Sequence, residues 1–443
     1  MITGKASEIV RFLSTEIHGI DAEFHGVSID SRTVNSSNIF FAIKGKKYDG
    51  HNFINDAVNN GASVVIAEKY IETDAQVCFI IVKDTLSALA DLAKYYRSQS
   101  NHIHTIAITG TNGKTSVTKL TAEILSKTKS IGTTIQNFNN EIGLPLSILN
   151  APSHADVNVY ELGASKKNDI KYLMDICNPN MTTLLNISPA HIESFGSFSV
   201  LKKTKEEIFE GKNIRTVILN IDDDNYDEWA RINKEKKVIT VSISNEADYF
   251  ILSESGKYIS IKTPLGTIKL NKTSIHCLLR INIIFSIALS MESGAKIETI
   301  TDSIENFPGV EGRFYRFKSR FGYDVIDDSY NANPKSMISA IDNVLNYKKN
   351  VIFVMGDMGE LGEKSRSHHI SVIQHAKDRG IRHLFYMGIF KDEAKGIFSE
   401  NCYTYDDMDN LIRELINIAR KEYVILIKAS RFMNFDTIAK ALR

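Results

Sequence analysis

The stretch HTIAITGTNGKTSVTKLTAEILSK, residues 104 to 127, decides the fold of this chain. Its first part, His104 to Thr109, is a short apolar run typical of a buried strand. A glycine-rich turn follows and leads into a helical pattern from Ser116 onward. Strand, phosphate-binding loop and helix in this order begin a parallel α/β unit. The sequence therefore predicts a parallel sheet with helices on its faces.

Similar strand-like runs occur on both sides of this stretch, separated by segments of helix length. Those before it are NIFFAI (38–43) and ASVVIAE (62–68), followed by the helical stretch TLSALADLAKYYRSQ. Those after it are VNVYELG (157–163), MTTLLNIS (181–188), TVILNID (216–222), and then DVIDDSY, NVIFVMGD, HLFYMG and YVILIKAS beyond Gly312. Residues 237–270 read as short polar strands, for which we expect a small antiparallel excursion.

The length predicts more than one domain, because 443 residues exceed the usual domain size of roughly 100 to 200 residues. We expect three α/β domains: residues 1–100, a central parallel-sheet phosphate-loop domain at 101–312, and a Rossmann-like C-terminal domain at 313–443. The seven prolines are scattered and no low-complexity tract occurs, so the joints between domains should be short.

Composition excludes several classes of protein. Apolar residues make up 43% and charged residues 24%, which is ordinary for a globular protein. Basic and acidic residues balance at 53 each, so no net charge favours nucleic acid or an anionic membrane. The start, MITGKASEIVRFL, lacks an apolar stretch of signal-peptide length, and no run of about 18 apolar residues occurs. We expect a soluble, cytoplasmic monomer.

The four cysteines, Cys78, Cys177, Cys277 and Cys402, lie far apart and include no CxxC pair. Neither a zinc site nor a disulfide framework is indicated. Buried small side chains in a reducing compartment are the expected role.

The loop Thr109-Gly110-Thr111-Asn112-Gly113-Lys114-Thr115 carries the strongest chemical signal. Glycines let backbone N–H groups surround phosphate oxygens, the lysine neutralises β- and γ-phosphate charge, and the threonine hydroxyl can bind Mg²⁺. The common phosphate-loop pattern has glycine where this chain has Ile108, so the match is to a shorter relative. The alternative interpretation of the same string is a structural turn.

This shorter loop resembles that of the Mur ligase and folylpolyglutamate synthetase superfamily. Glu161 in YELGA, His191 in NISPAHIESFGS and Lys205 in TKEEIFEG follow in the family's order and spacing. The resemblance implies that Thr115 and Glu161 bind one Mg²⁺, that His191 binds a second, and that Lys205 takes up CO₂ to become a carbamate ligand. Taken singly, these residues would read as a surface carboxylate, a satisfied histidine and a solvated lysine.

The same resemblance assigns the ATP and substrate residues. ATP is expected to contact Gly110, Thr111, Asn112, Gly113, Lys114, Thr115, Ser116, Asn282, Arg313, Asp328 and Tyr330. The nucleotide-sugar end is expected on Ser31 and Arg32, in DSR (30–32), because arginine's forked donors suit a diphosphate. Asn139, Asn140, Asn331 and Asn333 are expected near the peptide substrates.

Three longer strings narrow the family to one branch. QNFNNEIGLP (136–145), DDSYNANP (327–334), and GDM (356–358) with ELG (360–362) resemble the branch that adds D-alanyl-D-alanine. The DNPR signature of the neighbouring diamino-acid-adding branch is absent. KASR (428–431) also matches the family, with Asp436 where a glutamate is usual.

One segment departs from the family pattern. The family carries HN-x-x-N ahead of an alanine-rich helix, whereas this chain has Ile281, Asn282 and Phe285 at those three positions. We expect Ile281 and Phe285 to form an apolar wall beside adenine, which cannot read the hydrogen-bonding edge of the base.

The implied function is ADP-forming ligation of D-alanyl-D-alanine to a UDP-N-acetylmuramoyl tripeptide through an acyl phosphate. Such a ligase would serve peptidoglycan synthesis, and with it cell shape and division. Two alternatives stay open: a paralogue that amidates another nucleotide-linked acid, and a UDP-sugar-binding regulator with weak catalysis. The sequence leaves open the third residue of the tripeptide.

Overall fold

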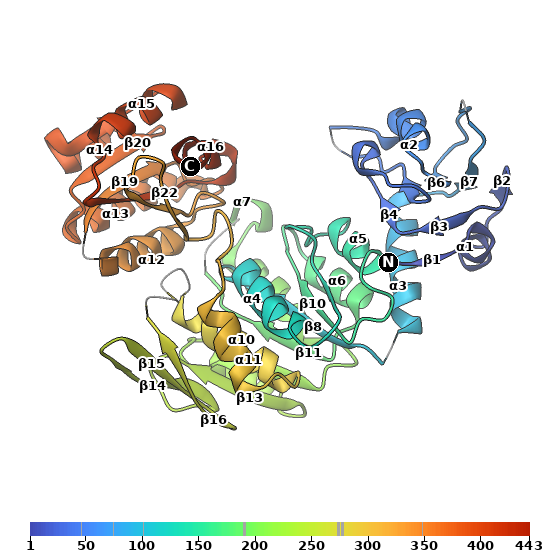
Figure 1. The fold of residues 1–443 in the computed structure, drawn as a ribbon, viewed down its shortest axis with the longest axis horizontal. Helices are drawn as coiled ribbons and strands as arrows, with labels where there is room; N and C mark the ends of the chain where they lie inside the picture. Colours follow the sequence, from blue (N-terminus) through green and yellow to red (C-terminus); the bar gives the residue numbers. More distant parts are fainter. Residues whose placement is uncertain are drawn as a thin grey trace.

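A computed structural model of the chain describes residues 1–45, 47–73, 75–100, 102–188, 192–272, 275, 279–347 and 349–443. These residues form an N-terminal, a central and a C-terminal body (Figure 1). Figure 1 shows the N-terminal body in blue and the C-terminal body in orange and red, on opposite sides of the central one. The expected α/β architecture is confirmed.

The N-terminal body is built around a sheet of order β2-β7-β6-β5-β4, in which β4 to β7 are parallel and β2 is antiparallel. Its elements are β1 (Thr3–Lys5), α1 (Ala6–Leu13), β2 (Ile17–His18), β3 (Glu23–His25), β4 (Val27–Ser28), β5 (Ile39–Phe41), α2 (Ile54–Asn59), β6 (Val64–Ala67), β7 (Cys78–Ile81) and α3 (Thr85–Gln99). The predicted strands at 38–43 and 62–68 are β5 and β6, and the predicted helix is α3.

The central body contains the sheet β16-β15-β14-β13-β12-β11-β8-β10-β9. Its strands are β8 (His104–Thr109), β9 (Ile131–Thr133), β10 (Val157–Glu161), β11 (Met181–Leu184), β12 (Thr216–Asn220), β13 (Lys237–Ser242), β14 (Tyr249–Ser255), β15 (Tyr258–Thr263) and β16 (Gly266–Asn271). Its helices are α4 (Lys114–Ser126), α5 (Gly143–Leu149), α6 (Asp169–Cys177), α7 (Ile192–Phe195), α8 (Phe198–Glu206), α9 (Tyr226–Ile232), α10 (Arg280–Glu292) and α11 (Ile297–Glu305).

The expectation of a separate antiparallel excursion at 237–270 is wrong in part. β13 pairs in parallel with β12, and β14 pairs in parallel with β13, so the central sheet continues outward. Only the β14-β15-β16 pairings are antiparallel. Tyr249 is fully buried and Val241 joins the same core, which gives this polar-looking segment its apolar face.

The C-terminal body has the sheet β17-β18-β22-β19-β20-β21, parallel except for β17 at one edge. Its elements are β17 (Tyr315–Lys318), β18 (Asp324–Asp327), α12 (Pro334–Val344), β19 (Asn350–Gly356), α13 (Ser365–Asp378), β20 (His383–Met387), α14 (Lys391–Phe398), β21 (Cys402–Thr404), α15 (Met408–Ile418), β22 (Tyr423–Lys428) and α16 (Asp436–Leu442).

The N-terminal body is joined to the central body by hydrogen bonds from side chains to the main chain. The Asn150 side chain accepts a bond from Val27 N at 3.0 Å and donates one to Val27 O at 2.9 Å. Helix α3 packs against α5 and α6, and its buried Arg97 donates from Nε to Cys177 O at 3.0 Å. These contacts hold the two bodies at a set spacing.

Cys78 and Cys177 are buried, and both are free thiols, as is Cys402. Cys277 lies outside the described residues. Within the described ranges, no helix is long and apolar enough to cross a membrane.

Candidate active site

A cavity of about 1120 Å³ lies between the central and C-terminal bodies and is lined by both. Most of the site residues predicted from sequence line it: Gly110, Thr111, Asn112, Gly113, Lys114, Thr115, Ser116, Asn139, Asn140, Glu161, Lys205, Asn282, Arg313, Asp328, Tyr330, Asn331 and Asn333. Residues up to 223 positions apart in the sequence thus share one cavity. The prediction for His191 falls outside the described residues.

The loop after β8 has the backbone that a phosphate-binding loop needs. β8 lies inside the sheet, between β11 and β10, so its carboxyl end opens where ligands bind in such sheets. Gly113 precedes α4 with φ of 86°, and an added Cβ there would lie 2.6 Å from Asn282 Oδ1. Only glycine fits this position, because both the left-handed backbone and the close Asn282 exclude a side chain.

The segment after β11 holds this loop in place. Asn112 N donates to Asn186 Oδ1 at 3.0 Å, and Asn186 Nδ2 donates to Asn112 O at 3.0 Å. Thr111 Oγ1 accepts a bond from Ser188 N at 3.0 Å. The loop is therefore organised before any phosphate arrives, which reduces the cost of ordering on binding.

Lys114 bends back over the loop that it follows. Its Nζ donates to Gly110 O at 2.9 Å and to Thr111 O at 3.2 Å. Burial lowers the pKa of Lys114, the Glu161 carboxylate opposes this shift, and Arg313 adds to it. Burial disfavours the charged form of Lys114, and the negative charge of an incoming polyphosphate stabilises that form.

Glu161 ends β10 and is buried, with its carboxylate at the cavity. Asn139 Nδ2 donates to Glu161 Oε1 at 2.6 Å, and Thr134 Oγ1 accepts the Glu161 N–H at 2.8 Å. The neighbouring Asn140 accepts the N–H of Gly143, the first residue of α5, on its Oδ1 at 2.9 Å. Asn139 thus orients the carboxylate, while Asn140 supports the local backbone.

Lys205 on α8 is buried, 4% exposed, and lines the same cavity. Burial and, after it, the Lys114 charge lower the pKa of Lys205 to about 7, against the opposing charges of Glu161 and Asp169. A substantial share of this amine is therefore uncharged near neutral pH. An uncharged buried amine is a nucleophile, unlike the solvated ammonium that a lone lysine would suggest.

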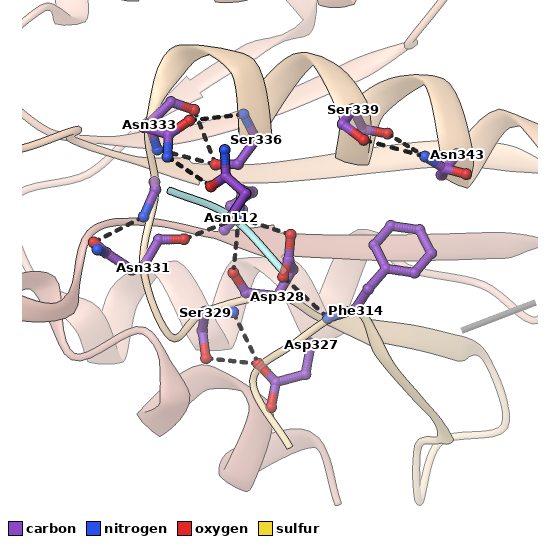
Figure 2. Close-up of polar contacts among 12 residues, drawn as sticks. Asn112, Phe314, Asp327, Asp328, Ser329, Asn331, Asn333, Ser336, Ser339 and Asn343 are labelled. Carbon is purple, nitrogen blue, oxygen red and sulfur yellow. Dashed lines mark hydrogen bonds and ion pairs between the residues drawn. The ribbon is translucent and has the colours of Figure 1, made fainter. Parts of the chain in front are cut away.

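The C-terminal wall is organised around an ion pair. Lys428 Nζ lies 2.7 Å from Asp328 Oδ2 and donates to Asn331 O at 2.9 Å. Asp328 Oδ1 accepts a bond from Phe314 N at 3.0 Å, as Figure 2 shows. Both carboxylate oxygens of Asp328 are thus engaged, and the loop from Asp328 to Asn331 is anchored on β22.

Arg313 and Tyr330 form a stacked pair at the joint between the two bodies. The Arg313 guanidinium carbon lies 3.8 Å from the centroid of the Tyr330 ring. Tyr330 OH accepts a bond from Asn137 Nδ2, a residue of the central body, at 2.9 Å. Among the described residues Arg313 Nε has no hydrogen-bond partner, so this donor is available to a ligand.

Asn331 and Asn333 differ in what their side chains do. Asn331 Oδ1 accepts the N–H of Ala332 at 2.9 Å. Asn333 caps α12 by accepting Ser336 N at 2.9 Å, and its Nδ2 donates to Asn112 Oδ1 at 2.9 Å (Figure 2). Most of the bonding capacity of the Asn333 amide is used inside the protein.

The expectation that Phe285 lies beside adenine is wrong. Phe285 is fully buried on α10 within the core of the central body and does not line the cavity. Ile281 does line it, together with Asn282. A residue four positions further along a helix lies on a similar face, but every residue of α10 from Asn282 to Met291 is buried, so the helix has no exposed polar face along this stretch.

One part of the cavity wall was not predicted from the sequence. Residues 222–225, directly after β12, line the cavity as Asp222, Asp223, Asp224 and Asn225. Asp222 is fixed by Ser242 Oγ at 2.6 Å and Ile243 N at 2.8 Å. Their position after a parallel strand was the signal that could have identified them.

Ser31 and Arg32 lie in the N-terminal body and do not line the cavity. Ser31 is buried, whereas the Arg32 side chain is exposed and binds Asp30 with Nε at 2.9 Å and with a terminal nitrogen at 2.6 Å. This pairing lowers the pKa of the Asp30 carboxyl.

Among the described residues no group of three His, Cys, Asp or Glu side chains could hold a metal ion.

Comparison with known proteins finds matches along most of the chain. The family descriptions "Mur ligase family, catalytic domain", "Mur ligase middle domain" and "Mur ligase, glutamate ligase domain" match residues 23–97, 108–284 and 312–431. The UDP-N-acetylmuramoyl-tripeptide–D-alanyl-D-alanine ligase of Escherichia coli (strain K12) is 31% identical, covering 100% of this chain and 99% of that protein. The ligase of the same name from Bacillus subtilis (strain 168) is 30% identical over 94% and 93%.

Solved structures give the same picture. MurF from Acinetobacter baumannii superposes with a TM-score of 0.87 at 27% identity, covering 100% of this chain and 99% of that one. The MurF ligase from Thermotoga maritima in complex with ADP has a TM-score of 0.78 at 25% identity, covering 94% and 97%. The whole arrangement of bodies is therefore similar.

Proposed function

The chain belongs to the Mur ligase family, and from this we propose that it joins D-alanyl-D-alanine to a UDP-N-acetylmuramoyl tripeptide while ATP is converted to ADP and phosphate. The observation that carries the proposal is the convergence of a phosphate loop, Glu161 and Lys205 with the C-terminal loops on one cavity. Curated relatives that carry this activity in their names match the chain over nearly its whole length.

The reaction has two steps. The terminal carboxylate of the tripeptide attacks the γ-phosphorus of ATP; a C–O–P bond forms, and ADP leaves as the bond to its β-phosphate oxygen breaks. The amine of D-alanyl-D-alanine then attacks the acyl carbon, a tetrahedral intermediate collapses, and phosphate leaves with the amine's proton released. The product amide is stable, so ATP drives the ligation.

The protein contributes positioning and electrostatics, because two anions must meet in the first step. The N–H groups after Gly110 and the Lys114 ammonium are suited to the charge of the transferred phosphoryl group. Arg313, with its free Nε, is suited to the nucleotide phosphates at the joint of the two bodies. The cavity lies between two bodies, so their approach excludes water from the acyl phosphate.

The donor set fits Mg²⁺. Thr115 and Glu161 present a hydroxyl and a carboxylate to the same cavity, and these are the hard oxygen ligands that Mg²⁺ prefers. When bound, Mg²⁺ screens the charge of the phosphate oxygens. Asn139 fixes the direction of the Glu161 carboxylate, and His191 remains the predicted ligand of a second ion.

Lys205 is proposed to carry a carbamate. Its amine is buried at the cavity, close enough to Lys114 for that charge to affect its pKa. Reaction of the neutral amine with CO₂ forms an N–C bond and releases one proton, which replaces a buried cation by an anion. A carbamate beside Lys114 would turn a like-charge repulsion into an attraction and add an oxygen ligand.

The N-terminal body is proposed to hold the UDP end of the substrate through Ser31 and Arg32, with residues 1–100, 101–312 and 313–443 as the functional domains. The loop around Asn331 is proposed to receive the dipeptide, and the cytoplasm is the proposed compartment.

The direct test is mass spectrometry of the products formed from ATP, UDP-N-acetylmuramoyl tripeptide and D-alanyl-D-alanine. Ligated pentapeptide with one ADP per product is expected. ADP release without the pentapeptide mass, or ligation of other UDP-linked acids only, would refute this substrate assignment.

A further inference from the structure

The amides of Asn112 and Asn333 meet across the boundary between the central and C-terminal bodies. Asn333 Nδ2 donates to Asn112 Oδ1 at 2.9 Å, although the two residues are 221 positions apart in the sequence. Figure 2 shows Asn112 below the start of α12, with the Asn333 side chain pointing toward it. One partner belongs to the phosphate loop and the other to the helix that borders the far wall of the cavity.

Both amides are held on their other sides as well. The Asn333 oxygen accepts Ser336 N at 2.9 Å, and Asn333 N donates to Ser336 Oγ at 3.0 Å, so the side chain is fixed by the capping box of α12. Asn112 Nδ2 donates to Ser188 Oγ at 3.3 Å, and its main chain is bonded on both sides to Asn186. The Asn112–Asn333 bond therefore joins two rigid pieces of structure.

We infer that Asn333 is a positioning residue that couples nucleotide occupancy of the phosphate loop to the position of the C-terminal body, through its bond to Asn112. The inference rests on the proposed function, in which that loop binds ATP. The phosphate loop and Arg313 line the same cavity from the two bodies, so a nucleotide that contacts both walls favours the arrangement in which the Asn112–Asn333 bond is made. The reverse also holds, because coupling between two binding events is reciprocal.

The same geometry explains why asparagine suits position 333. Capping α12 requires only a short side-chain acceptor, and serine serves as well as asparagine in that role. Reaching Asn112 requires a donor on the same side chain, which serine places too close to the backbone to supply. Asn333→Ser therefore separates the cap from the contact between bodies.

The coupling is measured as a ratio of dissociation constants. With UDP-N-acetylmuramoyl tripeptide saturating, the dissociation constant of D-alanyl-D-alanine is determined by calorimetry with and without a non-hydrolysable ATP analogue. We expect the analogue to tighten dipeptide binding in the unaltered protein, and Asn333→Ser to reduce that ratio by about two- to tenfold, the worth of one neutral hydrogen bond.

A double-mutant cycle assigns the effect to the pair. Asn112→Ser should reduce the same ratio, and the double variant should reduce it no further than either single one, because all three lack the same bond. The ratio cancels any direct loss of nucleotide affinity at Asn112. Additive effects, or an unchanged ratio in Asn333→Ser, would overturn the inference.

The matched control lies on the same helix. Asn343 donates from Nδ2 to Ser339 O at 2.7 Å within α12 (Figure 2), and among the described residues its side chain makes no hydrogen bond across the boundary. Asn343→Ser should leave the coupling ratio as in the unaltered protein, and a similar fall there would point to a general effect on α12.

A scattering measurement separates this inference from the substrate assignment. Small-angle X-ray scattering with ADP and Mg²⁺ needs neither the tripeptide nor turnover. Asn333→Ser should show a larger radius of gyration than the unaltered protein and Asn343→Ser. Identical curves would refute the positioning role even if ligation is confirmed, whereas a difference would support it even if the acceptor proves to be another acid.

Discussion

Asn139 donates a 2.6 Å hydrogen bond from Nδ2 to Oε1 of Glu161, so the carboxylate at the end of β10 is held by a residue of the preceding loop. Removing the donor leaves a buried carboxylate free to turn. We expect Asn139→Ala to lower kcat/KM by about 10- to 100-fold, as for loss of a residue that orients a metal ligand. Steady-state kinetics at several Mg²⁺ concentrations measure this. Asn213→Ala, which removes an exposed asparagine side chain outside the cavity, is the control and should stay near normal.

Lys114 tests the phosphate loop. Its ammonium is bonded to the loop carbonyls and poised for phosphate, so Lys114→Ala should lower ligation by at least about a hundredfold while the fold persists. Product formation and circular dichroism give the two readouts. Lys127→Ala, which removes an exposed cation at the other end of α4, should be close to normal. Near-normal turnover in Lys114→Ala would contradict the assignment.

Lys205 should carry the carbamate in solution. Protein kept in ¹³C-bicarbonate is expected to show a carbamate carbon by NMR that is absent from Lys205→Ala, and that variant should lose activity. Lys203→Ala removes an exposed cation from the same helix and should retain both signal and activity. An unmodified Lys205 in an active, nucleotide-bound enzyme would count against the proposal.

Ile281 and Phe285 should now behave differently from each other. Ile281→His places a polar group at the cavity and should change the ratio of ATP to GTP use by about two- to tenfold. Phe285→Asn should instead destabilise the fold by about 3–5 kcal/mol, because it leaves a cavity and a buried amide in the core. Thermal denaturation and nucleotide competition distinguish the two effects. A stable Phe285→Asn with altered base preference would restore the original expectation.

Asp324 provides a pH-dependent element of stability. Burial acts to raise its pKa, but bonds from Lys349 at 2.6 Å and Arg316 at 3.2 Å outweigh burial and lower it. The carboxylate therefore stabilises the fold above its unfolded-state pKa of about 4, and this contribution disappears as the pH falls through the lower folded-state pKa. Asp324→Asn should cost about 1.5–3 kcal/mol at pH 7.

Urea unfolding of both proteins from pH 7 to pH 3 measures that difference. It should shrink below about pH 4, and a difference that stays constant down to pH 3 would contradict the role of the charge.

The strands and the phosphate loop could be predicted from local patterns. The spacing of apolar residues and the choice of turn-forming residues depend only on positions that are neighbours in the sequence. They were not enough for β13, whose polar appearance hides an apolar face formed with α10. Nor could they show that Phe285 enters the core, since that depends on how α10 is rotated against the sheet. The Asn112–Asn333 bond lies beyond any local signal, because its partners meet only after two bodies have folded and docked.

The first two bodies are held at a fixed distance from each other. The bonds that hold them join Val27 to Asn150, and α3 to α6 through Arg97. Under the proposed assignment, a substrate bound at its nucleotide end by the N-terminal body must present its carboxylate to the central body at one fixed distance. A UDP-linked acceptor peptide that is one residue shorter would not reach Glu161. One that is a residue longer would extend past it. Under the proposed assignment of Ser31 and Arg32 to the nucleotide end, the first two bodies alone would select the length of the acceptor.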